Sequence, residues 1–495
     1  MCGIAGFCNF KEDFEENTDY WNFRLEKMRA VLAHRGNDAR GRYLKKHIGL
    51  SHSRLAIRDI LCGDQPMTRT HNGCDYTICY NGEIYNTDEL IPELSENGFV
   101  CSTTSDTEVI LYAYIHWGAD FVNRLNGIFA FAIWDAAENR LLLYRDRVGV
   151  KPLFYAIRGD SLVFGSEPKA CFAHPAVKPE LDKQGLQELL AIGPAHTSGL
   201  SLFKDLFEVL PGHFMIYSRD GLHDETYWEL TSREHTESYR DTVAHTRFLV
   251  EDAIKRQMVS DVPVCTFLSG GIDSSIVTAI AANYMNTRGK TLNTFSFDFK
   301  DNDRYFKANA FQPERDLPYV NRMLEEYETA HSYLECDENS LFKALFAAVD
   351  AKDMPGMTDV DSSLLYFCSL VSRKNKVALT GECADEIFGG YPWFYRKELL
   401  ERYGFPWSSD VAPRLALLRD DVGLELDLSG YQAFRYEESR SKAPLLFGEA
   451  GEDESRRIIG YLNIKWFMQT LLDRMDRTSM YSELEARVPF ADHRI

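Results

Sequence analysis

The sequence predicts two domains, an α+β half followed by an α/β half. Three observations lead to this fold class. The chain has 495 residues, which is too many for one typical hydrophobic core. Short strand-like segments separated by turn residues mark the first half, and strands alternate with helices after Tyr239. We therefore expect antiparallel sheets in the first half and a parallel sheet in the second.

The strands of the first half are predicted from short apolar segments bounded by Asp, Gly and Asn turns. We expect them at 128–135, 140–145, 152–156 and 161–165. Helical periodicity is sparser in this half and is clearest at 21–32 and 107–117. The polar stretch 217–240 has the composition of a loop and is predicted to be the linker. The predicted domains are therefore 2–218 and 240–495.

The second half alternates apolar runs with amphipathic segments. We expect strands at 262–268, 292–299, 331–336 and 376–379. We expect helices at 274–284, 317–327, 341–351 and 362–374. A parallel sheet whose strands are connected by helices is the arrangement that this alternation favours.

Composition excludes some classes of function. With 55 basic and 75 acidic residues, the formal net charge is −20, which disfavours nonspecific binding to nucleic acid or anionic membrane. No apolar run reaches the roughly 18 residues of a membrane-spanning helix, so we expect a cytoplasmic protein. The eleven cysteines contain no CxxC pair, which predicts that most of them are reduced core residues and that the protein has no structural metal site.

Cys2 is the first candidate catalytic residue. Removal of Met1 would leave a thiol and a free α-amine on one residue. The amine has an ordinary pKa of about 7.7–8.0 and can accept the proton of a thiol whose ordinary pKa is about 8.5. Taken alone, Cys2 is better explained as an incidental small residue at a frayed terminus.

Three further segments supply what an amide-attacking thiol needs. Arg54 offers a guanidinium for a carboxylate. Asn81 and Gly82 offer a side-chain NH2 and a backbone N–H for an oxyanion, at a dipeptide that favours turns. Asp106 offers a carboxylate for a substrate ammonium. Together with Cys2, these segments resemble the glutaminase domain of the class II, N-terminal-nucleophile amidotransferases.

A second chemical centre lies where the first strand of the α/β half meets its helix. The run 268–275 (LSGGIDSS) combines backbone N–H groups, hydroxyls and a helix N-terminus, which favour phosphate. The chain contains no GxxxxGK[ST], so this is not a Walker A loop. The run resembles the PP-loop of ATP pyrophosphatases, which split ATP into AMP and pyrophosphate.

An acidic segment follows a later strand. The run 379–391 (LTGECADEIFGGY) is expected at the carboxyl edge of the parallel sheet, beside the PP-loop. Asp273 and Asp385 can then hold Mg²⁺ against pyrophosphate, since this cation prefers carboxylate and phosphate oxygens. Glu382 is the candidate to steer or deprotonate the incoming nucleophile. The cluster of three acids is also explained as the solvated face of a loop.

The two centres in one chain resemble glutamine-hydrolysing asparagine synthetases. Almost the whole chain shares the resemblance, including the runs 34–36 (HRG), 145–153 (RDRVGVKPL) and 485–490 (EARVPF). The resemblance implies a four-layer αββα sandwich of the N-terminal-nucleophile hydrolases, followed by an adenine-nucleotide α-hydrolase-like domain. It also implies a glutamyl thioester, an internal ammonia tunnel, and delivery of ammonia to β-aspartyl-AMP. Glutamine, aspartate and ATP would be the substrates, with Mg²⁺ as the cation.

The resemblance also implies site residues. The catalytic set is Cys2, Asn81, Gly82 and Glu382. The glutamine-binding set is Arg54, Leu55, Ala56, Ile57, Arg58, Asn81, Gly82, Glu83 and Asp106. The ATP-binding set is Phe267, Leu268, Ser269, Gly270, Gly271, Asp273, Ser274, Ser275, Phe297, Thr380 and Gly381, and the metal set is Asp273 and Asp385. The acceptor is expected near 358–363 (TDVDSS).

Two departures from the family pattern lead to further expectations. Asn37 stands where the family usually has proline, which would alter a loop near the tunnel mouth. The family also continues beyond the EARVPF run through helices bearing a lysine that helps the synthetase step. We therefore expect glutamine hydrolysis with weak or absent amide synthesis. A different carboxylate acceptor, a regulatory homologue and a homodimer stay open.

Overall fold

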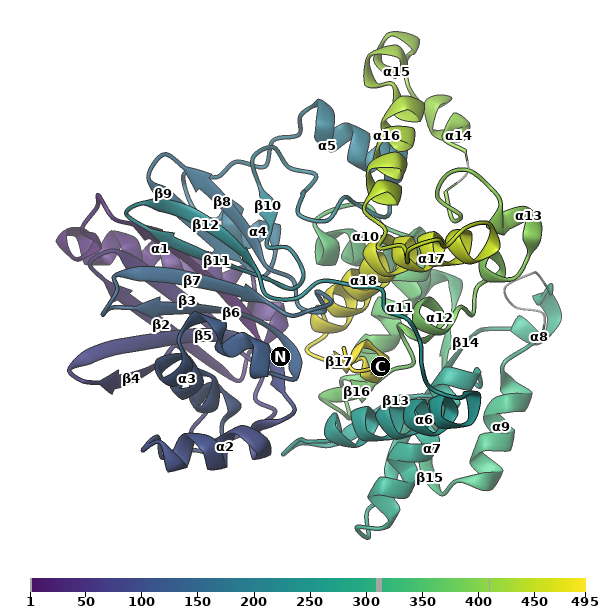
Figure 1. Ribbon diagram of the computed structural model, residues 1–495, viewed down its shortest axis with the longest axis horizontal. Helices are drawn as coiled ribbons and strands as arrows, with labels where there is room; N and C mark the ends of the chain where they lie inside the picture. The colour runs from purple at the N-terminus through teal and green to yellow at the C-terminus, as the bar shows by residue number, and fades with distance from the viewer. Residues whose placement is uncertain (1, 309–313, 409) are drawn as a thin grey trace.

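The computed structural model describes residues 2–308, 314–408 and 410–495, and its first half is built from two six-stranded antiparallel sheets (Figure 1). The first sheet has the order β10-β8-β9-β1-β3-β2 and the second has the order β12-β11-β7-β6-β5-β4. Their bounds are β1 Gly3–Asn9, β2 Ala39–Lys45, β3 Ile48–Arg54, β4 Met67–His71, β5 Cys74–Ile84, β6 Gly127–Asp135, β7 Arg140–Arg145, β8 Phe154–Arg158, β9 Ser161–Gly165, β10 Phe207–Glu208, β11 His213–Ser218 and β12 Gly221–Thr226.

The two sheets pack face to face and helices cover their outer faces. Ile4 and Leu50 of the first sheet share a buried cluster with Ala132 and Leu143 of the second. The outer face of the first sheet packs against α1 (Thr18–Ala30) and α4 (Pro168–Phe172), and that of the second against α2 (Thr87–Glu96) and α3 (Asp106–Trp117). The predicted αββα sandwich is thus confirmed.

The second half contains a five-stranded parallel sheet of order β15-β14-β13-β16-β17. Its strands are β13 Val264–Phe267, β14 Leu292–Phe299, β15 Thr329–Cys336, β16 Val377–Leu379 and β17 Glu485–Arg487. Helix α6 (Tyr239–Arg256) precedes the first strand. The helices between the strands include α7 Ile272–Asn286, α8 Asn302–Tyr305, α9 Leu317–Glu326, α10 Glu338–Lys352 and α11 Thr358–Val371. The predicted α/β domain is confirmed, and the expected strand 292–299 has the bounds of β14.

Helices dominate the chain between β16 and β17. They are α12 Ala384–Phe388, α13 Lys397–Leu400, α14 Ala412–Leu415, α15 Asp420–Leu426, α16 Leu428–Ser441, α17 Glu452–Leu462 and α18 Met468–Met480, while α5 (Lys183–Gln187) lies in the first half. Helix α18 passes between the two halves (Figure 1). Among the described residues, no helix combines the length and apolar character needed to cross a membrane.

The expected linker 217–240 is partly wrong, because β12 lies inside it and pairs with β11. Four of the six residues of β12 are exposed, and the strand lies at the edge of its sheet. An exposed edge strand is held by backbone hydrogen bonds on one side, so its side chains need not alternate between apolar and polar. The sequence pattern therefore does not distinguish it from a loop.

Buried ion pairs join the two halves. Arg35, fully buried, places Nη1 2.8 Å from Glu167 Oε1 and Nη2 2.8 Å from Asp476 Oδ2 of α18. Lys151 Nζ lies 3.2 Å from Asp476 Oδ1. Removing one partner of such a pair leaves an uncompensated buried charge, at a cost of about 3–5 kcal/mol. These contacts fix α18 against the N-terminal half.

Candidate active sites

A small cavity of about 30 Å³ surrounds Cys2 at the start of β1. It is lined by Cys2, Arg54, Leu55, Ile57, Arg58, Gly63, Gln65, Tyr80, Gly82, Glu83, Ser105, Asp106 and Thr107. Burial raises the pKa of the Cys2 thiol, and the Leu55 backbone N–H and the Arg54 charge offset this only in part. The segments predicted from the sequence to surround the thiol therefore do meet there.

Asn81 is oriented by the backbone of Cys2. The Cys2 N–H donates to Asn81 Oδ1 at 2.9 Å. Asn81 Nδ2 is buried and has no hydrogen-bond partner among the described residues. A buried amide donor without a partner is uncommon in folded proteins. Such a donor, held in place from its oxygen side, is suited to an oxyanion that forms during a reaction.

Position 82 needs glycine because the backbone of β6 comes very close to it, and this residue does not form a turn. The predicted turn at Asn81 and Gly82 is wrong, because both residues lie inside β5 and pair with Ala130 and Phe129. Gly82 has φ +157°, and a Cβ atom there would lie 2.1 Å from the carbonyl oxygen of Ile128. Any side chain would push β5 and β6 apart, so the strand needs glycine beside the cavity.

Asp106 stands in the first turn of α3, which Ser105 caps. Its Oδ2 accepts from the Tyr80 hydroxyl at 2.9 Å and from the Ile84 N–H at 3.0 Å. Arg58 Nη1 lies 3.9 Å from the same oxygen. The carboxylate is thus held rigidly at the wall of the cavity.

Arg54 and Ala56 make contacts that the sequence did not indicate. Arg54 donates to the carbonyl oxygens of Arg58, Asp59 and Ile60, and its Nη1 lies 3.0 Å from Asp64 Oδ1. It therefore ties down the 58–64 loop at the cavity. Ala56 does not line the cavity, and its N–H donates to Asp38 Oδ2 at 2.7 Å.

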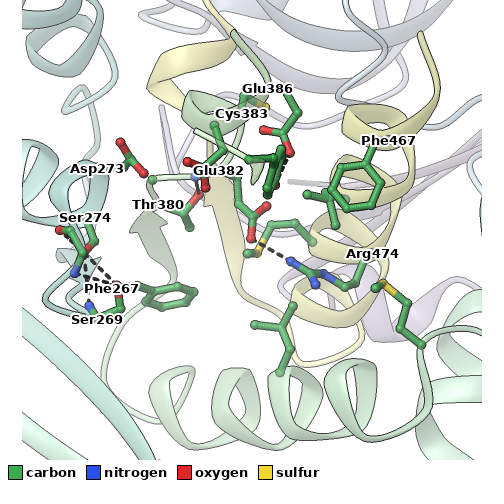
Figure 2. A pocket seen from close by; sticks show the side chains of 18 residues that line it. Phe267, Ser269, Asp273, Ser274, Thr380, Glu382, Cys383, Glu386, Phe467 and Arg474 are labelled. Carbon is green, nitrogen blue, oxygen red and sulfur yellow. Dashed lines mark hydrogen bonds and ion pairs between the residues drawn. The ribbon is translucent and has the colours of Figure 1, made fainter. Parts of the chain in front are cut away.

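A larger cavity of about 430 Å³ opens at the carboxyl ends of β13 and β16 (Figure 2). It is lined by Phe267, Ser269, Gly271, Asp273, Ser274, Met357, Leu364, Thr380, Gly381, Glu382, Cys383, Asp385, Glu386, Tyr391, Phe467, Leu471, Arg474 and Met475. The PP-loop residues lie on one side, and Phe467 and Arg474 face them from the other (Figure 2). The PP-loop and the acidic segment, predicted to meet, do meet here.

Hydroxyl groups hold the PP-loop in shape. Ser269 and Ser274 place their Oγ atoms 2.9 Å apart, and Ser274 Oγ donates to the carbonyl of Gly271 at 3.1 Å. Gly270 has φ +84°, a conformation that costs glycine little. The turn delivers the chain to the first residue of α7, whose N-terminus therefore faces the cavity.

Four of the predicted ATP-binding residues lie outside this cavity. Leu268 and Phe297 line a neighbouring cavity of about 20 Å³. Gly270 and Ser275 line an apolar groove between α7 and α9. The PP-loop turns sharply, so alternate residues of one short run face different spaces.

Acidic side chains in the cavity raise one another's pKa. Burial and the Asp385 charge raise the pKa of Asp273 to about 6. Burial and the Glu382 charge raise the pKa of Asp385. Burial also raises the pKa of Glu386 to about 7, although the Tyr391 hydroxyl donates to it. The cavity is therefore an acidic site in which a bound cation would be stabilised.

Arg474 is a cavity residue that the sequence did not indicate. Its Nη2 donates to Glu382 Oε1 at 2.9 Å, as Figure 2 shows. Arg474 lies on α18, 92 residues from Glu382, and no local motif marks it. Glu386 and Tyr391 also line the cavity, and both belong to the acidic run, which could have identified them.

The expected acceptor segment 358–363 borders the cavity only through its neighbours Met357 and Leu364. Asp361 is buried, and its Oδ2 accepts from the Met357 N–H at 2.8 Å. Lys352 Nζ lies 3.6 Å from the same oxygen. The Asp361 carboxylate thus holds the start of α11.

Family models match both halves of the chain. The glutamine amidotransferase domain matches residues 1–228, and asparagine synthase matches residues 245–495. Asparagine synthetase [glutamine-hydrolyzing] 3 of Bacillus subtilis (strain 168) is 48% identical and covers 100% of this chain, which spans 80% of that protein.

Two further relatives are more distant. Asparagine synthetase [glutamine-hydrolyzing] 1 of the same organism is 29% identical to this chain, and the match covers 99% of this chain and 79% of that relative. Amidase chyE of Penicillium rubens (strain ATCC 28089 / DSM 1075 / NRRL 1951 / Wisconsin 54-1255) is 30% identical to this chain, and the match covers 94% of this chain and 68% of that relative. The site segments, the two matched domains and the 48% identity together show that this chain belongs to the family of glutamine-hydrolysing asparagine synthetases.

Proposed function

We propose that this chain is a cytoplasmic enzyme that converts aspartate to asparagine with ATP and with ammonia from glutamine. One observation carries the proposal. A single buried apolar cluster contains Leu55 and Ile57, which line the Cys2 cavity, and Cys383, which lines the larger cavity. Ammonia released at Cys2 would stay in a dry environment and reach the second site without being protonated by bulk water.

The glutaminase step follows from Cys2 and Asn81. Once Met1 is removed, the Cys2 amine takes the thiol proton, and Sγ attacks the glutamine side-chain carbonyl carbon. The oxyanion would be stabilised by Asn81 Nδ2, which has no other hydrogen-bond partner among the described residues, and by the Gly82 N–H. The amine returns the proton to the leaving nitrogen, ammonia departs, and water hydrolyses the thioester to glutamate. Arg54 and Asp106 would hold the two charged groups of glutamine.

The synthetase step takes place in the larger cavity. The β-carboxylate of aspartate attacks the α-phosphorus of ATP, pyrophosphate leaves, and β-aspartyl-AMP forms. The PP-loop N–H groups and hydroxyls would hold the phosphates at the start of α7. Ammonia then attacks the acyl carbon and AMP leaves, while Glu382, oriented by Arg474, would accept the proton that the nitrogen loses.

Asp273 and Asp385 fit a divalent cation. Both carboxylates line the cavity, and neither forms an ion pair with a Lys or Arg side chain in the described part of the chain. Two carboxylates with phosphate oxygens form a donor set that Mg²⁺ favours, and the cation would neutralise charge on the leaving pyrophosphate. We propose Mg²⁺ as the cation at these residues.

Cation binding should depend on pH because protons compete for Asp273. Its pKa of about 6 in the folded protein lies above its ordinary 3.8. Without a cation, the stability that this group contributes is present below pH 3.8 and is lost as the pH rises through about 6. We expect Mg²⁺ with an ATP analogue to raise the melting temperature more at pH 7 than at pH 5, measured by differential scanning fluorimetry. An equal shift at both pH values would contradict the assignment.

The proposed function is tested with glutamine labelled with ¹⁵N at the amide, together with ATP, Mg²⁺ and aspartate. We expect the products to be ¹⁵N-asparagine, glutamate, AMP and pyrophosphate. Mass spectrometry detects the labelled asparagine, and an assay of pyrophosphate release follows the synthetase step. Pyrophosphate release driven by another carboxylate but not by aspartate would favour a different acceptor, as the relative named amidase leaves open. Absence of pyrophosphate with every acceptor would favour a regulatory protein.

A further inference from the structure

A buried lysine links three helices beside the larger cavity. Lys352, the last residue of α10, places Nζ 3.6 Å from Asp361 Oδ2 of α11 and 3.4 Å from Asp473 Oδ2 of α18. Lys352 and Asp361 are each 1% exposed, and Asp473 is half-buried. We call these three residues the lysine bridge. It ties the end of one helix to two others away from solvent.

Each charge of the pair Lys352 and Asp361 suits its place in a helix. Lys352 stands in the last turn of α10, where the carbonyl end of a helix favours a cation. Asp361 stands in the first turn of α11, where the N–H end favours an anion. A Cβ atom at Gly356, in the turn between the helices, would lie 1.9 Å from Asp361 Oδ2. The turn therefore packs directly on the charged pair.

The Asp361 carboxylate depends on Lys352 for its charge compensation. Its Oδ1 is buried and has no hydrogen-bond partner within the described ranges. In the part of the chain that the structure describes, Lys352 is the one cation that forms an ion pair with Asp361. Asp473 has a second cation, because Arg477 Nη1 lies 3.9 Å from its Oδ1. Loss of the lysine would thus leave Asp361 alone and remove the charge link between α11 and α18.

The lysine bridge borders the larger cavity through the neighbours of its two acids. Asp361 accepts from the N–H of Met357, which lines the cavity just before α11. Asp473 directly precedes Arg474, which lines the cavity from α18 and donates to Glu382. The PP-loop, where the proposed function places the phosphates of ATP, lies across the cavity from Arg474 (Figure 2). The space left for the acceptor carboxylate is therefore bounded by α11 and α18.

We propose that Lys352 is a positioning residue for the acceptor, because it fixes the start of α11 against α18. The proposal rests on the proposed function. Lys352 does not line the cavity, and it acts through Met357 and Arg474. Walls that are held less firmly bind the acceptor more weakly in the ground state and in the transition state alike. Loss of such uniform binding raises KM and leaves kcat nearly unchanged.

Lys352→Met tests the proposal in the full chain, with pyrophosphate release measured at varied aspartate and at varied ATP. We expect the KM for aspartate to rise about tenfold, which is within the effect of one hydrogen bond to a charged group. The kcat should stay within about threefold and the KM for ATP within about twofold, because the lysine bridge does not join β13 or α7, which carry the PP-loop. Lys343→Met, an exposed lysine of the same helix, is the matched control and should change none of these quantities.

A double variant separates positioning from charge compensation. Lys352→Met alone leaves a buried carboxylate without a cation, which can prevent folding. Lys352→Met with Asp361→Asn removes both charges of the pair, while Asp473 keeps Arg477. The amide oxygen of asparagine can still accept from the Met357 N–H. We expect the double variant to melt near the wild-type temperature and still to show the raised KM for aspartate, because the link between α11 and α18 is absent.

The outcomes are distinguishable. A wild-type KM for aspartate in the double variant would mean that Lys352 only compensates a buried charge, and would overturn the proposal. An equal rise in the KM for ATP, or the same rise for aspartate in Lys343→Met, would overturn it as well. Wild-type chain that releases no pyrophosphate with aspartate would overturn the proposed function, and the positioning role with it.

Discussion

Replacing Cys2 with alanine should abolish glutamine hydrolysis and spare synthesis driven by ammonium. The thiol forms the covalent intermediate in the proposed reaction, and loss of such a nucleophile costs roughly 10⁶-fold in rate. The ammonium-driven reaction uses the larger cavity, which Cys2 does not line. Glutamate release and asparagine formation, measured side by side with both nitrogen sources, test this expectation.

Cys8→Ala is the matched control for Cys2→Ala. Cys8 is a fully buried cysteine in β1, the strand that directly follows Cys2, and it does not line the Cys2 cavity. This variant loses one buried sulfur atom and should keep both activities. Glutaminase activity retained in Cys2→Ala would refute the nucleophile assignment. Mass spectrometry that finds Met1 attached in active protein would refute the role of the free amine.

Replacing Asp273 with asparagine should lower aspartate-dependent pyrophosphate release by about 10³-fold or more. A catalytic cation contributes several kcal/mol of charge stabilisation, and each ~1.4 kcal/mol is a tenfold change in rate. The substitution removes one of the two proposed carboxylate ligands with little change in volume. Glutamine hydrolysis takes place in the other domain and should stay at the wild-type rate.

Asp303→Asn, an exposed acid in α8, is the control for charge alone and should leave pyrophosphate release unchanged. The Mg²⁺-dependent increase in melting temperature should also be smaller in Asp273→Asn at pH 7. ADP as the nucleotide product would contradict the interpretation of 268–275 as a PP-loop. Undiminished pyrophosphate release would remove Asp273 from the site.

The sequence by itself determined the chemistry that is encoded in short contiguous runs. The PP-loop and the acidic run each follow a buried strand, and the carboxyl ends of neighbouring parallel strands must meet at one edge. The bounds of β14 were predictable because a buried strand between polar turns has a strong local pattern. Local patterns of this kind do not depend on partners that are distant in the chain.

Only the tertiary structure decided which distant residues complete the sites. Arg474 reaches Glu382 from α18, and Arg487 reaches Glu83 from the other end of the chain. Asn81 and Gly82 favour a turn locally, but pairing with Ala130 and Phe129 of β6 keeps them in a strand, since the backbone hydrogen bonds between these two strands outweigh a dipeptide preference. Contacts between residues far apart in sequence depend on how whole sheets and helices pack, and a linear pattern of residue types does not specify that packing.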